Sequence, residues 1–303
     1  MVTAVSGLTD DEVAAWCAAL GIPGLVDAHV HFLPPRVMAR VREHFDTAGP
    51  LLGRPWPVLY RGDDGELLGQ LRALGVRRFT ALPYAHRPGI AGYLNDWAAQ
   101  LAAANQDCVP SATFFPEPGV TDEVRRRLDA GVRVFKVHVQ VGDFSPVDPL
   151  LDDVWALLAD SGTPVVLHAG SGPVPNRHTG PDQVAELLRR HPGLRLVLAH
   201  MGAPEYAEFL ELIESSQRAC LDTTMAFTGF FEQMAPYPTD LLPRVRDLGL
   251  AGRVLLGSDF PNIPYPYAHQ LESLSRLDLG SGPDDVDWLR SVCWHNGARL
   301  FGS

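Results

Sequence analysis

Residues Gly24–Phe32 read Gly-Leu-Val-Asp-Ala-His-Val-His-Phe, and the pair Pro34-Pro35 follows closely. The run is short, apolar and partly β-branched, and the prolines stop it, which predicts a buried strand that ends in a tight turn. Because side chains alternate between the faces of a strand, His29 and His31 are expected to point to the same side. Two imidazoles at one strand end are a pair of ligands for a divalent transition metal. The alternative is two histidines in an ordinary turn.

The length and composition are those of a large globular protein. The chain has 303 residues, of which 46% are hydrophobic, and we expect a single domain over residues 1–303 because no linker or shift in composition marks a boundary. A formal net charge of −11 argues against nucleic acid or an anionic membrane surface as the main partner. No apolar run approaches the roughly 20 residues that cross a bilayer, so we expect no membrane segment.

The compartment is predicted from the N-terminus and the cysteines. Residues Met1–Ser6 lack the basic and apolar regions of a signal peptide. Cys17, Cys108, Cys220 and Cys293 are scattered, with no short spacing typical of a zinc knuckle or a redox pair. We therefore expect reduced thiols in a cytoplasmic protein.

Beyond the first strand, short apolar runs alternate with helical patterns in units of about 25 to 35 residues. Such a rhythm predicts the α/β class and a (β/α)8 TIM barrel, distorted, with its chemistry at the C-terminal strand ends. A doubly wound open sheet is the rival, but no Gly-rich phosphate turn follows an early strand. A helical region is expected from about Gly229 to Leu248. The other seven strands are predicted at Arg77–Ala85, Cys108–Pro116, Arg133–Gln140, Thr163–Gly170, Leu194–Gly202, Arg218–Ala226 and Arg253–Pro261.

Ionisable residues recur where these strands end. A buried imidazole or carboxylate is costly without a partner, and convergence on one metal ion would supply a partner for several of them. Taken singly, each histidine could instead bond to the backbone. The residues are Lys136 and His138 on the fourth strand, His168 on the fifth, His200 on the sixth and Asp259 on the eighth, besides His29 and His31.

Two further groups are candidates for substrate contact. Lys136 and His138 share one face of their strand and are expected to face the barrel interior. Arg177 and His178 lie in the Gly- and Pro-rich loop Ser171–Gly180, where a polar loop without a role is the alternative.

The order of these motifs resembles the amidohydrolase superfamily of metal-dependent barrels. The resemblance rests on the His-x-His of the first strand, the histidines that close the fifth and sixth strands, and Gly-Ser-Asp-Phe-Pro on the eighth. The closing segment 294–302, Trp-His-Asn-Gly-Ala-Arg-Leu-Phe-Gly, is similar to the C-terminal segment of the amidohydrolase-related branch. That branch includes aminocarboxymuconate semialdehyde decarboxylase, related non-oxidative decarboxylases, lactonases and hydrolases.

The resemblance implies one divalent metal, usually zinc, bound by His29, His31, His168 and Asp259. His200 would stand beside the water that the metal activates and would handle protons, and Asp259 would shuttle a proton to the leaving group. In other branches a carboxylated lysine of the fourth strand bridges two metals, so a binuclear centre with Lys136 remains an alternative.

The resemblance leaves the reaction open. We expect hydrolysis of a small organic ester, lactone or amide, with non-oxidative decarboxylation of an unsaturated or aromatic carboxylic acid as the alternative. A catalytically silent barrel that binds a ligand is the third interpretation, and it is weakened because every implied position is present. The expected partner is a small molecule, and a homodimer is an expectation at the level of the family.

Overall fold

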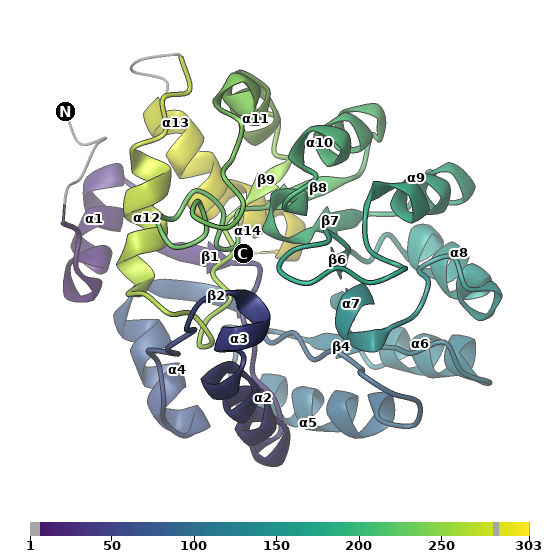
Figure 1. Ribbon diagram of the computed structural model, residues 1–303. Coiled ribbons are helices and arrows are strands. Elements are labelled where there is room, and N and C mark those ends of the chain that lie inside the picture. The colour runs from purple at the N-terminus through teal and green to yellow at the C-terminus, as the bar shows by residue number, and fades with distance from the viewer. Residues whose placement is uncertain (1–6, 281–284, 303) are drawn as a thin grey trace. The chain divides into compact units, whose positions relative to one another are not determined.

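The computed structural model describes residues 7–280 and 285–302, which form two compact units. The first unit comprises residues 7–31, 35–79, 222–280 and 285–302, and the second comprises 32–34 and 80–221. In each unit, parallel strands alternate with helices (Figure 1). The fold class is therefore α/β of the (β/α)8 type, as the sequence predicts. The expectation of one domain over the whole chain stays a prediction.

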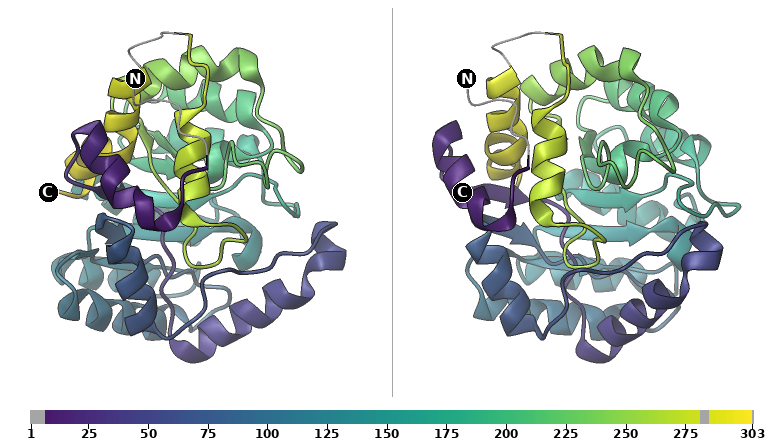
Figure 2. Two further views of the ribbon diagram at one scale, coloured as in Figure 1. Left: turned by 90° about the vertical axis from the view of Figure 1, so that its left-hand side faces the viewer. Right: turned by 60° about the vertical axis from the view of Figure 1, so that its left-hand side comes forward.

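The first unit carries the His-x-His strand and both ends of the described chain. Helix α2 projects at the edge of this unit in Figure 2, in keeping with Met38 being the single buried residue among its thirteen. The elements of this unit are η1 (Asp10–Glu12), α1 (Val13–Leu20), β1 (Leu25–Asp27), α2 (Pro35–Thr47), α3 (Gly49–Leu52), α4 (Asp64–Ala73), β2 (Val76–Thr80, whose last residue belongs to the second unit), η4 (Thr239–Leu241), α11 (Leu242–Leu250), β9 (Val254–Leu255), α12 (Tyr267–Ser275), α13 (Asp285–Arg290), the π-helical turn η6 (Ser291–His295) and α14 (Asn296–Phe301).

Strand β1 lies between β2 and the segment that contains β9. It pairs in parallel with β2, Leu25 standing opposite Val76. On its other side, the backbone N–H of Ala28 donates to the carbonyl oxygen of Leu256 at 2.8 Å, and Val30 forms a parallel bridge with Phe260. The ends of β1 and β9 therefore run side by side within this unit.

The second unit holds strands β3 to β7 and most of β8. In these strands, nearly every residue is buried, because the helices of parallel α/β folds cover both faces. The elements are α5 (Ala91–Ala104), β3 (Cys108–Val109), β4 (Ser111–Thr113), α6 (Val120–Asp129), β5 (Val134–His138), α7 (Val139–Gly142), η2 (Pro149–Leu151), α8 (Asp152–Ser161), β6 (Val165–His168), α9 (Pro181–Arg190), β7 (Leu196–Leu198), η3 (Ala199–Gly202), α10 (Tyr206–Ser215) and β8 (Cys220–Asp222, whose last residue belongs to the first unit).

The strands of the second unit pair in parallel in the order β4-β5-β6-β7-β8. The register sets residues of neighbouring strands side by side, and His138 of β5 stands opposite His168 of β6. The other pairs include Thr113 with Lys136, Val165 with Leu196 and Val197 with Cys220.

Two predicted elements differ from the structure in kind, and the strands predicted at 77–85, 194–202, 218–226 and 253–261 are shorter there, as β2, β7, β8 and β9. The strand expected over Cys108–Pro116 is split into β3 and β4 at Pro110, which has no N–H for the ladder, although its carbonyl oxygen accepts the N–H of Arg133 at 2.8 Å. The helix expected from Gly229 begins only at Leu242, after η4, and the residues before it form turns. Pro236 and Pro238 lie in that stretch, which explains why its apolar pattern does not continue as a helix.

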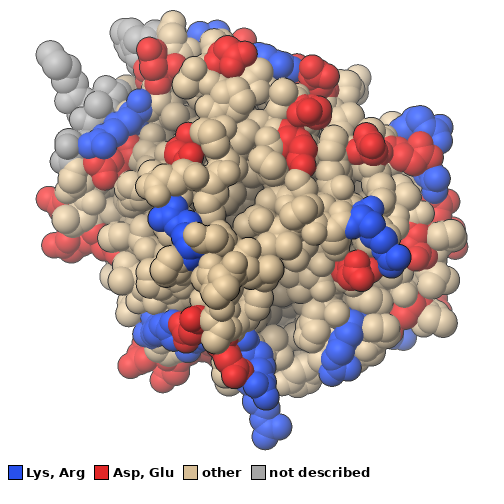
Figure 3. All heavy atoms as spheres, in the orientation of Figure 1, with Lys and Arg blue, Asp and Glu red and all other residues tan. Residues whose placement is uncertain are grey.

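Expectations drawn from the composition can be compared with the structure. All four cysteines are free thiols, and Cys17, Cys108 and Cys293 are buried. In the described part of the chain, no helix is both long and apolar enough to span a bilayer. Acidic and basic side chains are interspersed on the face drawn in Figure 3, so the net negative charge of the chain is not gathered in one patch there.

Gly170, two residues after β6, packs closely against the chain at Gly202 and Ala203, and a substitution there tests this packing. A Cβ there would stand 2.3 Å from the carbonyl oxygen of Ala203, which is backbone and cannot swing away. Gly170→Ala is therefore expected to lower the free energy of unfolding by about 1–3 kcal/mol, measured by urea denaturation.

Gly193→Ala is the control for this substitution. Its Cβ would meet only the Cβ of Ala159, at 3.7 Å, an ordinary contact. We expect a change within about 0.5 kcal/mol. Equal destabilisation by both substitutions would contradict the close packing at Gly170.

Candidate functional site

The two histidines that follow β1 converge as the sequence predicts. His29 and His31 are both buried, and their rings meet edge to face with centroids 5.0 Å apart. The two Nε2 atoms are 3.2 Å apart. The alternation of side chains along an extended chain thus places both imidazoles on one side, with the same nitrogen of each directed to a common point.

Asp259 reaches the same point from the segment after β9. Its backbone N–H donates to the carbonyl oxygen of His29 at 2.9 Å, and the N–H of His31 donates to the carbonyl oxygen of Phe260 at 2.8 Å. The Oδ1 atom of Asp259 lies 3.0 Å from the Nε2 of His31 and 3.6 Å from the Nε2 of His29.

These three atoms form a ligand set for a metal. Their mutual separations are 3.0, 3.2 and 3.6 Å. Ligands of a tetrahedral zinc ion, bound at about 2.0–2.2 Å, lie about 3.3 Å from one another. Two imidazole nitrogens and a carboxylate oxygen are also the donor types that zinc takes in proteins. The residues of the first unit therefore fit three positions of a divalent metal site.

A second carboxylate, which the sequence analysis did not single out, faces the other side of His29. Asp222 ends β8 and is fully buried, and its Oδ2 lies 2.9 Å from the Nδ1 of His29. Its Oδ1 accepts the backbone N–H of Thr224 at 3.1 Å. The one signal in the sequence is an acidic residue directly after Cys-Leu in a predicted strand.

A third carboxylate, Asp27, joins the ends of β1 and β9. Its Oδ1 accepts the backbone N–H of His29 at 3.1 Å, and its Oδ2 accepts the hydroxyls of Ser258 at 2.5 Å and Tyr267 at 2.8 Å. Complete burial raises the pKa of the Asp27 carboxyl to about 7, although these hydrogen bonds favour its ionised form. Asp27 thereby fixes the backbone on which His29 and Asp259 stand.

The second unit collects its own polar residues at the ends of β5, β6 and β7. The rings of His138 and His168 are stacked with centroids 4.0 Å apart, and the ring of His168 is 4.5 Å from that of His200. Lys136, two residues before His138 on β5, is fully buried. The sequence predicted these residues together at the strand ends, and within this unit the three imidazoles form a continuous row.

His200 departs from the prediction in its backbone. It lies in the turn η3 after β7 rather than on the strand, with φ of 55°, and Met201 follows with φ of 56°. These are left-handed conformations that non-glycine residues rarely adopt. The strand therefore ends at Leu198, and the turn directs the chain so that the ring of His200 lies beside that of His168.

Arg177 and His178 lie in the loop between β6 and α9. The Nε of Arg177 donates to the Nε2 of His178 at 2.9 Å, and the side chain of Asn176 accepts the N–H of His178. Asn176 in turn donates to the carbonyl oxygen of Gln140 at 3.1 Å, in α7. The loop is thus fastened to the short helix that directly follows His138.

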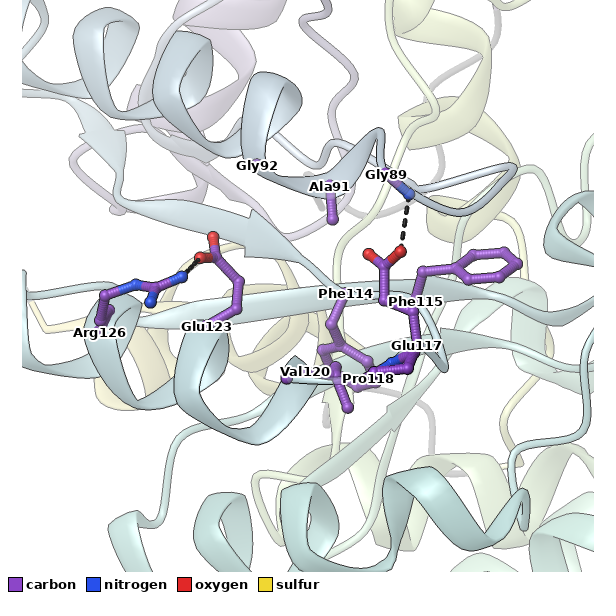
Figure 4. Close-up of a pocket in the computed structure, with 11 residues that line it drawn as sticks. Gly89, Ala91, Gly92, Phe114, Phe115, Glu117, Pro118, Val120, Glu123 and Arg126 are labelled. Atoms are coloured by element: carbon purple, nitrogen blue, oxygen red, sulfur yellow. Dashed lines mark hydrogen bonds and ion pairs between the residues drawn. The ribbon is translucent and has the colours of Figure 1, made fainter.

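An open pocket of about 200 Å³ lies elsewhere in the second unit, between the start of α5 and the start of α6 (Figure 4). Its charged groups bond to the protein itself: Glu117 accepts the N–H of Gly89 at 2.7 Å, and Glu123 pairs with Arg126. None of the predicted site residues is among the residues that line it. We therefore place the candidate site at the strand ends and not in this pocket.

The aromatic residues of the long loops have a structural role in the first unit. Trp56 is buried, stacks on Phe45 with centroids 5.4 Å apart and meets Phe230 edge to face. Its Nε1 donates to the carbonyl oxygen of Asn262 at 2.8 Å, three residues after Asp259. These rings therefore pack the loop 49–62 against the segment that carries Asp259.

Comparison with known proteins gives a family and a fold. Residues 26–303 match the family model described as "Amidohydrolase". None of the curated proteins matches the chain.

Three solved structures illustrate the similarity of fold. The 5-carboxyvanillate decarboxylase of Sphingomonas paucimobilis is 18% identical, covers 92% of this chain and 99% of its own, and has a TM-score of 0.63. A probable 2-pyrone-4,6-dicarboxylic acid hydrolase from Acinetobacter baumannii, with citric acid bound, is 15% identical over 92% and 100% of the two chains, with a TM-score of 0.60. An amidohydrolase from Burkholderia multivorans with bound zinc is 16% identical over 91% and 98%, with a TM-score of 0.61.

Asp27 makes the stability of the protein depend on pH. The native carboxyl keeps its proton up to about pH 7, whereas an unfolded chain releases it near the ordinary value of 3.8. The native state then binds more protons between these values, so the contribution of Asp27 to the free energy of unfolding falls as the pH rises from about 4 to about 7, by up to about 4 kcal/mol. We expect Asp27→Asn to remove this fall, measured by urea denaturation from pH 4.5 to 8 with a chelator present.

Asp129→Asn, an exposed position on α6, is the control and should leave the pH profile unchanged. An identical slope in the Asp27→Asn variant and the unaltered protein would show that Asp27 does not titrate in this range.

Proposed function

This chain belongs to the amidohydrolase family, and on that premise we propose that it is a metal-dependent hydrolase of a small organic ester, lactone or amide. The observation that carries the proposal is the convergence of the Nε2 atoms of His29 and His31 with the Oδ1 of Asp259, at separations of 3.0–3.6 Å. A ligand set this close is what a single divalent ion requires. The zinc in the amidohydrolase from Burkholderia multivorans supports zinc as the proposed metal.

We assign the metal to His29, His31 and Asp259, with His168 as the proposed fourth ligand. A divalent metal bound there supplies Lewis acidity, which polarises a carbonyl group and lowers the pKa of water towards about 7. The chain's own part is to orient the ligands, and Asp27 contributes by accepting the backbone N–H of His29.

The proton transfers are proposed for His200 and Asp259. A neutral imidazole at His200 can accept a proton from attacking water and return it, which is the usual role of histidine near pH 7. The Asp259 carboxylate can act as a shuttle that first takes up a proton and then passes it to the leaving group. His200 is buried, with 7% of the residue exposed.

Substrate binding is proposed for Lys136, His138, Arg177 and His178. The structure supports the first pair by their common face on β5, and the second pair by the anchoring of their loop to α7. These residues offer a cation and ring N–H groups to the oxygens of a small polar substrate. A homodimer and the cytoplasm remain expectations from the sequence.

Decarboxylation of an unsaturated or aromatic carboxylic acid is the second candidate. It is favoured by the similarity of fold to 5-carboxyvanillate decarboxylase, and Lys136 on β5 is the basic residue that we propose to bind the substrate carboxylate. The same lysine, if carboxylated, would serve a binuclear centre, which is the alternative to one metal.

His29→Ala tests the metal site. The purified protein is expected to hold about one divalent ion per chain, measured by inductively coupled plasma mass spectrometry, and the variant is expected to lose it because one of three convergent ligands is gone. His44→Ala, at an exposed position of α2, is the matched control. Unchanged metal content in a folded His29→Ala variant would refute the site, and two ions per chain would favour the binuclear alternative.

The reaction is tested with a panel of lactones, esters and amides and a second panel of unsaturated and aromatic carboxylic acids. We expect acid release from the first panel, followed with a pH indicator, and loss of that release after chelation. Carbon dioxide from the second panel, without acid release from the first, would replace hydrolysis by decarboxylation.

A further inference from the structure

Both nitrogens of the His29 ring contact other side chains, and the contact at Nδ1 indicates a role for Asp222. The Nε2 side belongs to the proposed ligand set, and the Nδ1 side lies 2.9 Å from the Oδ2 of Asp222. Asp222 is fully buried, and it lies on β8, a strand from which neither the sequence nor the family resemblance took a ligand.

The pair fixes the tautomer of His29. A carboxylate oxygen only accepts hydrogen bonds, so an Nδ1 at 2.9 Å from it must carry the proton. The lone pair of the neutral ring is then on Nε2, the atom that faces His31 and Asp259. A metal can bind only that unprotonated nitrogen.

Asp222 is itself held in place. Its other oxygen accepts the N–H of Thr224, and the side chain of Gln270 in α12 donates to the carbonyl oxygen of Thr223 at 3.1 Å. Gly257 packs closely against this pair, since a Cβ there would stand 2.1 Å from the Oγ1 of Thr224, 2.9 Å from the Cβ of His29 and 3.3 Å from the Cγ of Asp222.

We propose that Asp222 is a positioning residue that holds His29 in its metal-binding tautomer and orientation. The inference rests on the proposed metal site but does not depend on whether the reaction is hydrolysis or decarboxylation. Carboxylates that orient a ligating histidine typically change metal affinity by 10–100-fold when removed.

The test is metal affinity, measured by competition of Zn²⁺ between the protein and a chromophoric chelator. Asp222→Ala is expected to bind Zn²⁺ about 10–100-fold more weakly. Asp222→Asn has nearly the same shape, but its amide offers one accepting oxygen, whereas the Nδ1–H of His29 and the N–H of Thr224 each need one. This variant is therefore also expected to weaken Zn²⁺ binding, by at least about 10-fold. With Co²⁺ as a probe, both variants should show a changed visible absorption spectrum, which a role in folding alone would not produce.

Asp152→Ala is the matched control. Asp152 makes the same kind of contact, its Oδ1 lying 3.0 Å from the Nε2 of His191, but Asp152 begins α8 and His191 directly follows α9 in the second unit. The Zn²⁺ affinity and the Co²⁺ spectrum of the Asp152→Ala variant should equal those of the unaltered protein. Unchanged affinity and spectrum in both Asp222 variants would overturn the proposal while leaving the metal site intact. Failure of the unaltered protein to bind Zn²⁺ would refute the metal site and this inference together.

Discussion

The backbone pairing between the segments that extend β1 and β9 is the constraint on which the proposed metal site depends. The N–H of Asp259 reaches the carbonyl oxygen of His29, and the N–H of His31 reaches that of Phe260, across more than 200 residues of sequence. With the backbones locked in this register, period-two alternation brings two imidazoles and a carboxylate to one point. The buried Asp27 then ties the two segments together by accepting the hydroxyl of Ser258, while it also accepts the N–H of His29 in its own segment and the hydroxyl of Tyr267 in α12. The geometry of the proposed ligands thus depends on this backbone pairing as well as on the left-handed conformation of Asp259.

The alternation of strands and helices could be predicted because parallel α/β folds bury strands on both faces, which leaves short continuous apolar runs. Val165–His168 and Leu196–Leu198 are such runs, and both were located from sequence. The failures have local causes. Pro110 divides an apolar run that otherwise reads as one strand, and the segment after Gly229 carries apolar residues that pack turns rather than a helix. A periodic apolar pattern predicts which residues are buried, but it does not predict which backbone N–H and C=O groups form hydrogen bonds with one another.

The candidate site was predictable to the extent that its residues follow apolar runs. His29, His31 and Asp259 stand at strand ends, and the imidazoles of the second unit do the same. Asp222 and Asp27 were missed because a single aspartate in or after a strand looks like a turn residue. Their partners lie far along the chain, 193 residues away for the pair of Asp222 with His29 and 231 for that of Asp27 with Ser258. Pairings of this range follow from the fold, which composition and spacing do not supply.

Two residues of the proposed chemistry, His200 and Asp259, occupy left-handed backbone, with φ of 55° and 73°. For residues with a Cβ, each such conformation costs roughly 1–2 kcal/mol. Glycine would relieve that cost and would also abolish the imidazole or the carboxylate. Selection for thermal stability alone would therefore favour glycine at these positions. Ranking substitutions by melting temperature would then remove the two groups to which we assign proton transfer and metal binding.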